Sequence, residues 1–139
     1  MKKMMLILLF IAYSSVVHNS SIYALYITKA EPIAPYKKLI YAINMVEARV
    51  DTTTFDTLAY NEKEHAIGAF QIRDCRRIHY NKLTGKDVQS DDLYDYSISL
   101  EIFIYFAREY GNDLETISKK WNGSGPKTEE YWNKVKLYL

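Results

Sequence analysis

The stretch "SISLEIFIYFAREYG", residues 97–111, constrains the fold of this chain more than any other. In a helix its apolar side chains cover nearly every side, so other elements have to surround it. We expect it to form the central buried helix of a domain and to end at Gly111. With 139 residues, 48% of them apolar, the chain has room for one domain around that helix.

Four shorter segments repeat apolar residues at helical spacing, which predicts further helices. Their apolar positions are Leu39, Ile43, Val46 and Val50; Ile72, Cys75, His79 and Leu83; Leu114 and Ile117; and Tyr131, Trp132, Val135 and Leu139. We expect Gly85 to end the second segment, and Asn112 and Thr128 to cap the last two. Residues 51–68 are rich in Thr, Asp and Asn and predict an ordered loop or small hairpin. The sequence therefore predicts an α+β domain, predominantly α-helical, with a small irregular or β lobe between the first two helices.

The N-terminal 24 residues have the pattern of an export signal. Two lysines form a basic start, residues 4–17 are mostly apolar, and Ala24 is a small residue suited to cleavage. The apolar run is too short to span a bilayer as a mature helix. We expect a signal peptide over 1–24 with cleavage near Ala24, a lead-in arm over 25–36, and an exported protein, periplasmic or extracellular. An uncleaved membrane anchor is the alternative.

Charge and cysteine content narrow the function classes. Without residues 1–24, 16 basic and 17 acidic residues remain, a formal net charge of −1, so nucleic acid is not an expected partner. A single thiol, Cys75, excludes an intramolecular disulfide, and its helical spacing favours a small buried side chain over a reactive thiol. His65 and His79 show no ligand spacing, and no phosphate-binding glycine loop is present. No metal or organic cofactor is expected.

Glu47 lies at the edge of the apolar stripe of the first predicted helix, next to Ile40 and Ile43. A carboxylate partly buried among aliphatic side chains loses hydration, which raises its pKa. A raised pKa is what a general acid needs near neutral pH. The alternatives are that Glu47 pairs with an Arg or Lys and is structural, or that the helix is rotated and exposes it.

The loop "AYNEKEHAIGAFQI", residues 59–72, follows the Glu47 helix and can fold back over the carboxylate. Gly68, Phe70 and Gln71 end this loop, and a glutamine side chain can hydrogen-bond both a hydroxyl and an amide. Tyr60 and Asn61 suit stacking and hydrogen bonding in the same cleft. Taken alone, these are also ordinary turn and core residues.

The segment "WNGSGP", residues 121–126, predicts a loop because two glycines and a proline crowd it. Trp121 can pack on the apolar face of a sugar, and the Asn122 amide can bind an N-acetyl group. The alternative is a buried Trp that anchors a helix junction.

The motifs "VEARVD", "DTLAYN", "EHAIGAFQI", "WNGSGP" and "YWNKV", taken in this order, resemble the transglycosylase SLT domain family, which has a lysozyme-like fold. The family pattern is a Glu on a helix, then Gly-x-x-Gln, then a segment like Tyr-Asn-x-Gly. These fall at Glu47, at Gly68 to Gln71 and at Trp121 to Gly123. The resemblance covers residues 37–136 and implies a lysozyme-like transglycosylase domain over 37–139.

The resemblance implies a peptidoglycan lytic transglycosylase that cleaves the β-1,4 bond between N-acetylmuramic acid (MurNAc) and N-acetylglucosamine (GlcNAc). Glu47 would be the single general acid/base, and the muramoyl 6-hydroxyl would close a 1,6-anhydro ring without water. Gln71 would hold the sugar backbone and Asn122 would lie in the groove wall. The expected partners are peptidoglycan glycan strands and, beyond them, a secretion or conjugation assembly, with the protein itself a monomer.

Two alternatives stay open at this point. A lysozyme-type hydrolase would use a second carboxylate, for which Asp51, Asp56 and Glu64 are candidates. A catalytically weak peptidoglycan-binding or assembly protein would keep the fold without turnover. Ala48 stands where the family usually has Ser, and Trp121 where it usually has Tyr, which keeps this second alternative open.

Overall fold

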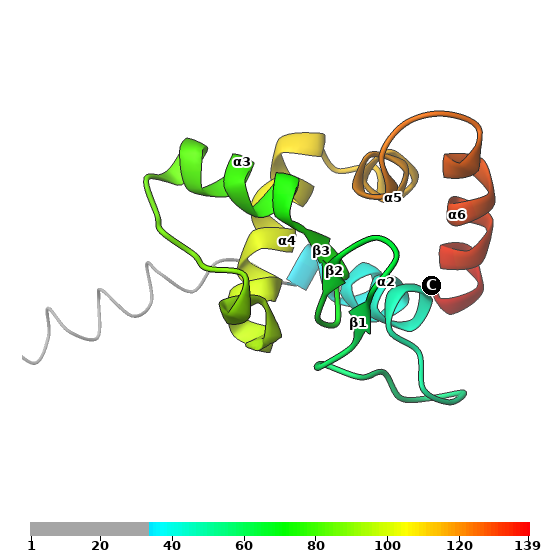
Figure 1. Ribbon diagram of the computed structural model, residues 1–139. Coiled ribbons are helices and arrows are strands. Elements are labelled where there is room, and N and C mark those ends of the chain that lie inside the picture. Colours follow the sequence, from blue (N-terminus) through cyan, green and yellow to red (C-terminus); the bar gives the residue numbers. More distant parts are fainter. Residues whose placement is uncertain (1–33) are drawn as a thin grey trace, which may run out of the picture. The chain divides into compact units, whose positions relative to one another are not determined.

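Helix α4, Tyr96–Tyr110, is the longest helix in the part of the chain that this computed structural model describes, residues 34–139 (Figure 1). The Asp95 carboxylate caps it by accepting hydrogen bonds from the backbone N–H groups of Ser97 at 2.7 Å and Ile98 at 3.2 Å. Gly111 follows its last residue. Ile102, Phe103 and Ala107 are wholly buried, so the predicted central helix and its end are confirmed.

Within residues 34–139, four further α-helices and a small sheet surround α4. The helices are α2 (Lys37–Glu47), α3 (Asp74–Thr84), α5 (Leu114–Asn122) and α6 (Lys127–Val135), and the short 3₁₀ helices are η1 (Ala34–Tyr36), η2 (Asp91–Tyr94) and η3 (Lys136–Tyr138). The strands β1 (Tyr60–Asn61), β2 (Ala66–Ile67) and β3 (Ile72–Arg73) form an antiparallel sheet in the order β1-β2-β3. The described chain is therefore α+β and mostly helical, with its β lobe between the first two α-helices, as predicted.

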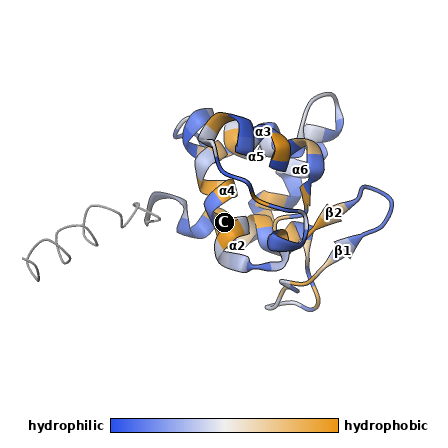
Figure 2. Ribbon diagram, turned by 60° about the vertical axis from the view of Figure 1, so that its left-hand side comes forward, coloured by the Kyte–Doolittle hydropathy of each residue, from blue (hydrophilic) through white to orange (hydrophobic). Residues whose placement is uncertain are grey.

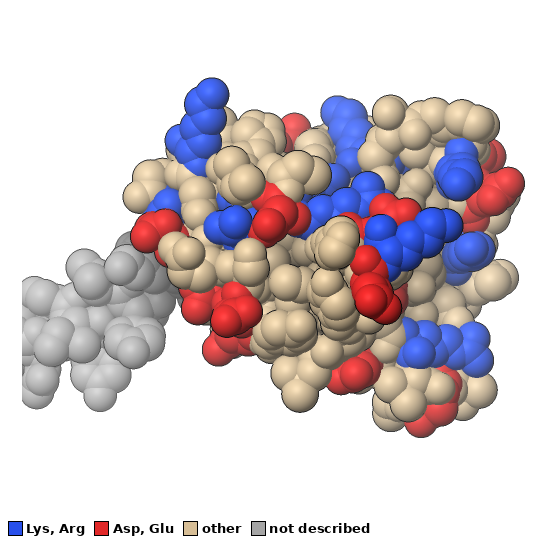
Figure 3. All heavy atoms as spheres, viewed as in Figure 1, with Lys and Arg blue, Asp and Glu red and all other residues tan. Residues whose placement is uncertain are grey.

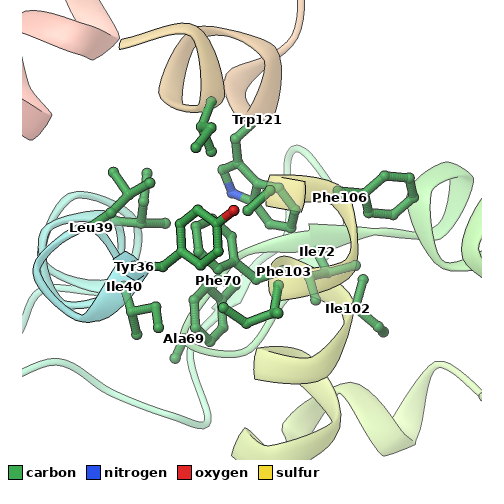
Figure 4. Packing of buried hydrophobic residues seen from close by; sticks show 14 of the residues in the cluster. Tyr36, Leu39, Ile40, Ala69, Phe70, Ile72, Ile102, Phe103, Phe106 and Trp121 are labelled. Atoms are coloured by element: carbon green, nitrogen blue, oxygen red, sulfur yellow. The ribbon is translucent and has the colours of Figure 1, made fainter. Parts of the chain in front are cut away.

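The core lies where α2, α4 and α5 meet the turn before β3. Phe70 and Phe103 stack with ring centroids 5.0 Å apart, and Trp121 meets Phe103 edge-on at 4.9 Å (Figure 4). Leu39 and Ile43 close the α2 side with no exposed surface. Hydrophobic residues of the helices face this core, whereas the loop that joins β1 to β2 is hydrophilic (Figure 2). Burying this aromatic and aliphatic surface is the main stabilising contribution to the fold.

Helices α5 and α6 form a hairpin that places the C-terminal part of the chain beside α2. Helix α5 packs on α4, while α6 and η3 pack on α2. The Lys119 ammonium joins the hairpin by contacting Glu115 at 2.6 Å and Glu129 at 2.5 Å. Val135 of α6 is fully buried. This packing brings a residue near the end of the chain to the last turn of α2.

Helix α2 ends at Glu47, three residues earlier than the apolar stripe indicated. The Ala48 N–H still bonds to the Asn44 carbonyl at 2.9 Å, but the chain then turns into a loop. The Asp51 carboxylate holds this loop by accepting from the Thr53 and Thr54 N–H groups at 2.7 and 2.9 Å. The sequence predicted that Val50 lies on the apolar face of this helix. That prediction is wrong, because Val50 lies beyond the end of α2 and is 68% exposed.

Three predictions at the later helices also need correction. Ile72 belongs to β3, and α3 begins only at Asp74. The cap of α5 is Asp113 rather than Asn112, since the Asp113 carboxylate accepts from the Thr116 N–H at 2.8 Å. Residue Thr128 lies inside α6, with its hydroxyl donating to the Gly125 carbonyl at 2.8 Å. Gly85 does end α3, in a left-handed conformation at φ +71°.

The predicted signal peptide over 1–24 and most of the arm over 25–36 lie outside the described residues. Among the helices between residues 34 and 139, none has the length and apolar character needed to cross a membrane.

Candidate functional site

Glu47 is the last residue of α2 and is half-buried. Its Oε1 accepts a hydrogen bond of 2.7 Å from the Tyr131 hydroxyl, which α6 supplies. Burial raises the pKa of Glu47 to about 7, against the opposing effects of the Tyr131 hydrogen bond and of the positive charges on Arg73, Arg76 and Lys134. The partner of the carboxyl is thus a neutral hydroxyl, unlike the Arg or Lys of the structural alternative.

The sequence reasoning missed Tyr131, the hydrogen-bond partner of the acid, as well as Arg73 and Arg76 in the pocket lining. The Tyr131 side chain is 7% exposed, and burial together with the neighbouring Glu47 raises its pKa well above 10. The hydroxyl therefore stays protonated and donates to the carboxylate. Helical spacing in "YWNKV" placed Tyr131 on a buried face, but spacing alone carries no sign of its partner.

Two hollows adjoin Glu47. The first, called here the arginine pocket, has a volume of about 430 Å³ and is lined by Val46, Glu47, Asn61, Glu64, Ala66, Gln71, Arg73, Cys75, Arg76, Trp121, Asn122 and Gly123. The second, the hairpin groove, has about 770 Å³ and is lined by Val46, Glu47, Ala48, Arg49, Val50, Asp56, Ala59, Tyr60, Asn61, Glu62, Lys63 and Gln71. Four residues line both hollows, Val46, Glu47, Asn61 and Gln71, so the acid lies where the two hollows meet.

Five of the seven predicted binding residues line these hollows. Asn61 and Gln71 line both, Tyr60 lines the hairpin groove, and Trp121 and Asn122 line the arginine pocket. The Asn61 side chain also accepts from the Glu64 N–H at 3.2 Å, which fixes the turn of the hairpin. The predicted set is therefore largely brought together around one carboxyl group.

Gly68 and Phe70 line neither hollow, and their predicted binding role is wrong. Phe70 has no exposed surface because its ring is packed among the aromatic rings of the core. Gly68 is needed for the backbone: its φ is +75°, and a Cβ there would lie 2.4 Å from the Leu93 carbonyl oxygen. Both residues hold the turn before β3 in place.

Gln71 is positioned by that turn. Its φ of +46° is left-handed, and its Nε2 donates to the Gly68 carbonyl at 3.0 Å and to the Ala59 carbonyl at 3.3 Å. These bonds hold the amide nitrogen on the backbone and leave Oε1 as the group available to a ligand. Strain of this kind persists where the surrounding structure enforces it.

Trp121 is a core residue whose face is already covered. Its side chain is 4% exposed, and the Arg76 guanidinium carbon lies 4.0 Å from the centroid of its ring. The prediction that the indole packs on a sugar is wrong in this structure, and the alternative, a buried Trp at a helix junction, holds. Asn122 is half-buried and keeps its place in the pocket wall.

The three candidate second carboxylates lie in different surroundings. Glu64 lines the arginine pocket, where its Oε2 pairs with Arg73 at 3.0 Å. Asp56 lines the hairpin groove and accepts from the Leu58 N–H at 2.8 Å. Asp51 lines neither hollow, and hydrogen bonds from Thr54 and Thr53 lower its pKa to about 2. Each carboxylate already has a partner.

The prediction that Cys75 is a small buried side chain is wrong, because the residue is exposed and lines the arginine pocket. Helix α3 buries only Tyr80 fully, so the helical period in this segment did not mark a core face. No cluster of three or more His, Cys, Asp or Glu side chains suited to a metal ion occurs within residues 34–139.

Comparisons with protein-family models, with curated proteins and with solved structures find no match. What the site can do therefore follows from its geometry. A carboxyl group with a pKa near 7 can give up a proton and take one back at neutral pH. Glu47 lines both hollows, and the amide groups of Asn61, Gln71 and Asn122 suit hydroxyl and acetamido groups.

Proposed function

We propose that residues 37–139 form a lysozyme-like transglycosylase domain that cleaves peptidoglycan glycan strands. The observation that carries this proposal is Glu47, a carboxyl group with a pKa of about 7 at the junction of two hollows. The order of the motifs around Glu47, Gln71 and Asn122 adds the resemblance to the SLT family. Export, indicated by residues 1–24, is consistent with a substrate in the cell wall.

In the proposed reaction, protonated Glu47 donates its proton to the glycosidic oxygen between MurNAc and GlcNAc. The bond from C1 of MurNAc to that oxygen breaks, and GlcNAc leaves with a free 4-hydroxyl. The Glu47 carboxylate then removes the proton from the muramoyl 6-hydroxyl as O6 bonds to C1 and closes the 1,6-anhydro ring. One carboxyl group serves both steps, and no water is consumed.

Tyr131 orients Glu47 in this scheme. The family usually places a Ser directly after the catalytic Glu, whereas Ala48 has no hydroxyl and is 6% exposed. In this chain a hydroxyl reaches the carboxyl from α6 instead. The departure at Ala48 is therefore compatible with turnover.

Two alternatives are separated from this proposal by their products. A lysozyme-type hydrolase would use Glu64 or Asp56 to activate water and would leave reducing ends. Glu64 is held by Arg73, which is a reason to prefer the single-carboxyl scheme. A peptidoglycan-binding or assembly protein would pull down sacculi and release nothing.

The test is mass spectrometry of peptidoglycan digested with the purified protein. We expect 1,6-anhydro-muramoyl ends from the wild type and at least a hundredfold slower release from Glu47→Gln, since general acid catalysis contributes about 10²–10⁴ in rate. Glu130→Gln, an exposed glutamate on α6, is the matched control and keeps full activity. Reducing ends that disappear in Glu64→Gln would establish the hydrolase instead.

A further inference from the structure

Arg76 lines the arginine pocket, and no carboxylate of residues 34–139 lies within ion-pair distance of it, although the charge of Glu47 acts on it at longer range. Its guanidinium carbon lies 4.0 Å from the ring centroid of Trp121 and 5.6 Å from that of Phe106. One N–H donates to the Lys120 carbonyl at 3.4 Å, and burial lowers its pKa from the ordinary value. No ion pair to Arg76 occurs within the described part of the chain. A half-buried cation of this kind is costly unless an anion meets it.

The charges that line the arginine pocket do not balance when Glu47 is protonated. Its lining contains four ionised or ionisable residues besides Cys75: Glu47, Glu64, Arg73 and Arg76. Glu64 and Arg73 form an ion pair at 3.0 Å. Protonated Glu47 is neutral, so the charge of Arg76 is left over and the pocket carries +1. The acid-competent form of the site is therefore complementary to an anion.

The positive charge of Arg76 attracts a ligand through local contacts in the pocket and not through a wide field over the surface. Acidic and basic side chains are interleaved over the face shown in Figure 3, with no broad field of one sign. A guanidinium that lies over an aromatic ring is fixed in place, and its N–H donors match the two oxygens of a carboxylate. The position of Arg76 in the same pocket as Glu47 and Asn122 puts such an anion close to the reacting sugar.

We propose that Arg76 is a specificity-determining residue that binds a carboxylate of the glycan substrate. This inference rests on the proposed function and names its preferred substrate as strands that carry a negative charge near the scissile bond. In peptidoglycan the carboxylate has two sources, the lactyl group of a muramoyl residue without its peptide, and the stem peptide itself.

Binding of that carboxylate affects the acid as well. The positive charge of Arg76 lowers the pKa of Glu47. A substrate carboxylate beside Arg76 neutralises this effect, so the proton on Glu47 is held more firmly in the complex than in the free protein. The substrate charge then favours the form of Glu47 that protonates the glycosidic oxygen.

The experiment measures Kd by calorimetry with the Glu47→Gln protein, whose neutral side chain imitates the protonated acid. The ligands are strands stripped of peptides, strands that keep them, and each of the two after conversion of carboxylates to amides. We expect about tenfold tighter binding of a charged ligand than of its amide, the size of one charge-assisted hydrogen bond. Preference confined to stripped strands identifies the lactyl carboxylate, and preference confined to peptide-bearing strands identifies the stem peptide.

When Arg76→Gln is added to the Glu47→Gln protein, we expect the preference for charged over amidated strands to disappear. Arg76→Lys in the same background should keep part of that preference. Lys82→Gln removes one exposed cation from the same helix α3 and should keep all of it. Equal binding of charged and amidated strands overturns the proposal without any variant at Arg76, so misfolding cannot hide the result. Anhydro ends released without charge preference overturn only the role of Arg76. Charge preference without anhydro ends supports Arg76 and overturns the transglycosylase proposal.

Discussion

The Tyr131 hydroxyl affects both the orientation and the proton affinity of the Glu47 carboxyl group. Its hydrogen bond of 2.7 Å fixes Oε1 and lowers the pKa of Glu47, whereas burial raises it further than the hydrogen bond lowers it. The outcome is a pKa of about 7. Tyr131 keeps its own proton because its pKa is raised well above 10. The pair therefore titrates through Glu47 alone near neutral pH.

Replacing Tyr131 by Phe tests this balance. Loss of the hydrogen bond raises the pKa of Glu47, so the alkaline limb of the pH–rate profile moves to higher pH, because a general acid acts in its protonated form. We expect kcat to fall about tenfold as the carboxyl loses its fixed orientation. The control is Tyr138→Phe, which removes a hydroxyl that accepts a hydrogen bond from Arg49 at 3.0 Å. It should change neither the alkaline limb of the pH–rate profile nor kcat. A shift of the limb to lower pH in Tyr131→Phe would contradict this account.

At the scale of elements, the turn from β2 to β3 positions the wall of the site. The Gly68 N–H bonds to the Ala59 carbonyl at 2.8 Å, and the Gln71 N–H bonds to the Gly68 carbonyl at 2.9 Å. The backbone of Gly68 lies against the Leu93 carbonyl, which also accepts from the Ser99 hydroxyl at 2.6 Å. Gly68 thus supports Gln71 and does not itself line either hollow.

A comparison of Gly68→Ala with Gly85→Ala distinguishes the effect of a steric clash on stability from the effect of a left-handed backbone conformation. Both glycines have positive φ, +75° and +71°, but only the Cβ at residue 68 meets another atom, the Leu93 oxygen at 2.4 Å. We expect Gly68→Ala to lower the free energy of unfolding by about 3 kcal/mol, combining strain with displaced backbone. Gly85→Ala should cost only about 1 kcal/mol for the left-handed conformation. Urea unfolding measures both, and equal losses would show that the close approach does not matter.

For the whole molecule, the buried acid links stability to pH. The pKa of Glu47 is about 7 in the folded protein against 4.5 as its ordinary value, so between these pH values the folded chain binds more protons than the unfolded one. The contribution of Glu47 to the free energy of unfolding is therefore greatest below pH 4.5. It decreases as the pH rises from 4.5 to about 7 and stays at its lowest value above that. The penalty at higher pH is about 3 kcal/mol, at 1.36 kcal/mol for each pKa unit.

Glu47→Gln should therefore stabilise the fold above pH 8 by up to about 3 kcal/mol and change little at pH 4. Gln keeps an oxygen that can accept from Tyr131, so the packing is preserved. Denaturant unfolding over this pH range measures the effect, with the exposed Glu130→Gln as control. A variant that is less stable than the wild type at pH 8 would show that the carboxylate stabilises the fold in its charged form.

Some of this architecture could be predicted from sequence. An all-round apolar run such as residues 97–111 has to be buried, and glycines at 85 and 111 end helices because no side chain opposes the required backbone. Glu47 could be singled out because it interrupts an apolar stripe. These signals are local, and each follows from the period of a helix or the conformational freedom of one residue.

Other features depend on tertiary packing. Helical spacing around Cys75 did not show that this face of α3 borders a pocket. Asn112 and Asp113 are both capable of capping α5, and only the path of the chain after α4 selects Asp113. Tyr131 lies 84 residues from Glu47, so its contact depends on how α6 packs on α2.

Helix α2 ends at the residue that carries the acid, and the helix itself contributes to its chemistry. Aligned peptide dipoles give the C-terminal end of a helix about half a negative charge, which disfavours a second negative charge there. The neutral form of Glu47 is therefore favoured by the helix backbone as well as by burial. Acids are common in the first turn of a helix and unfavourable in the last, and at this position the unfavourable placement helps to retain the proton.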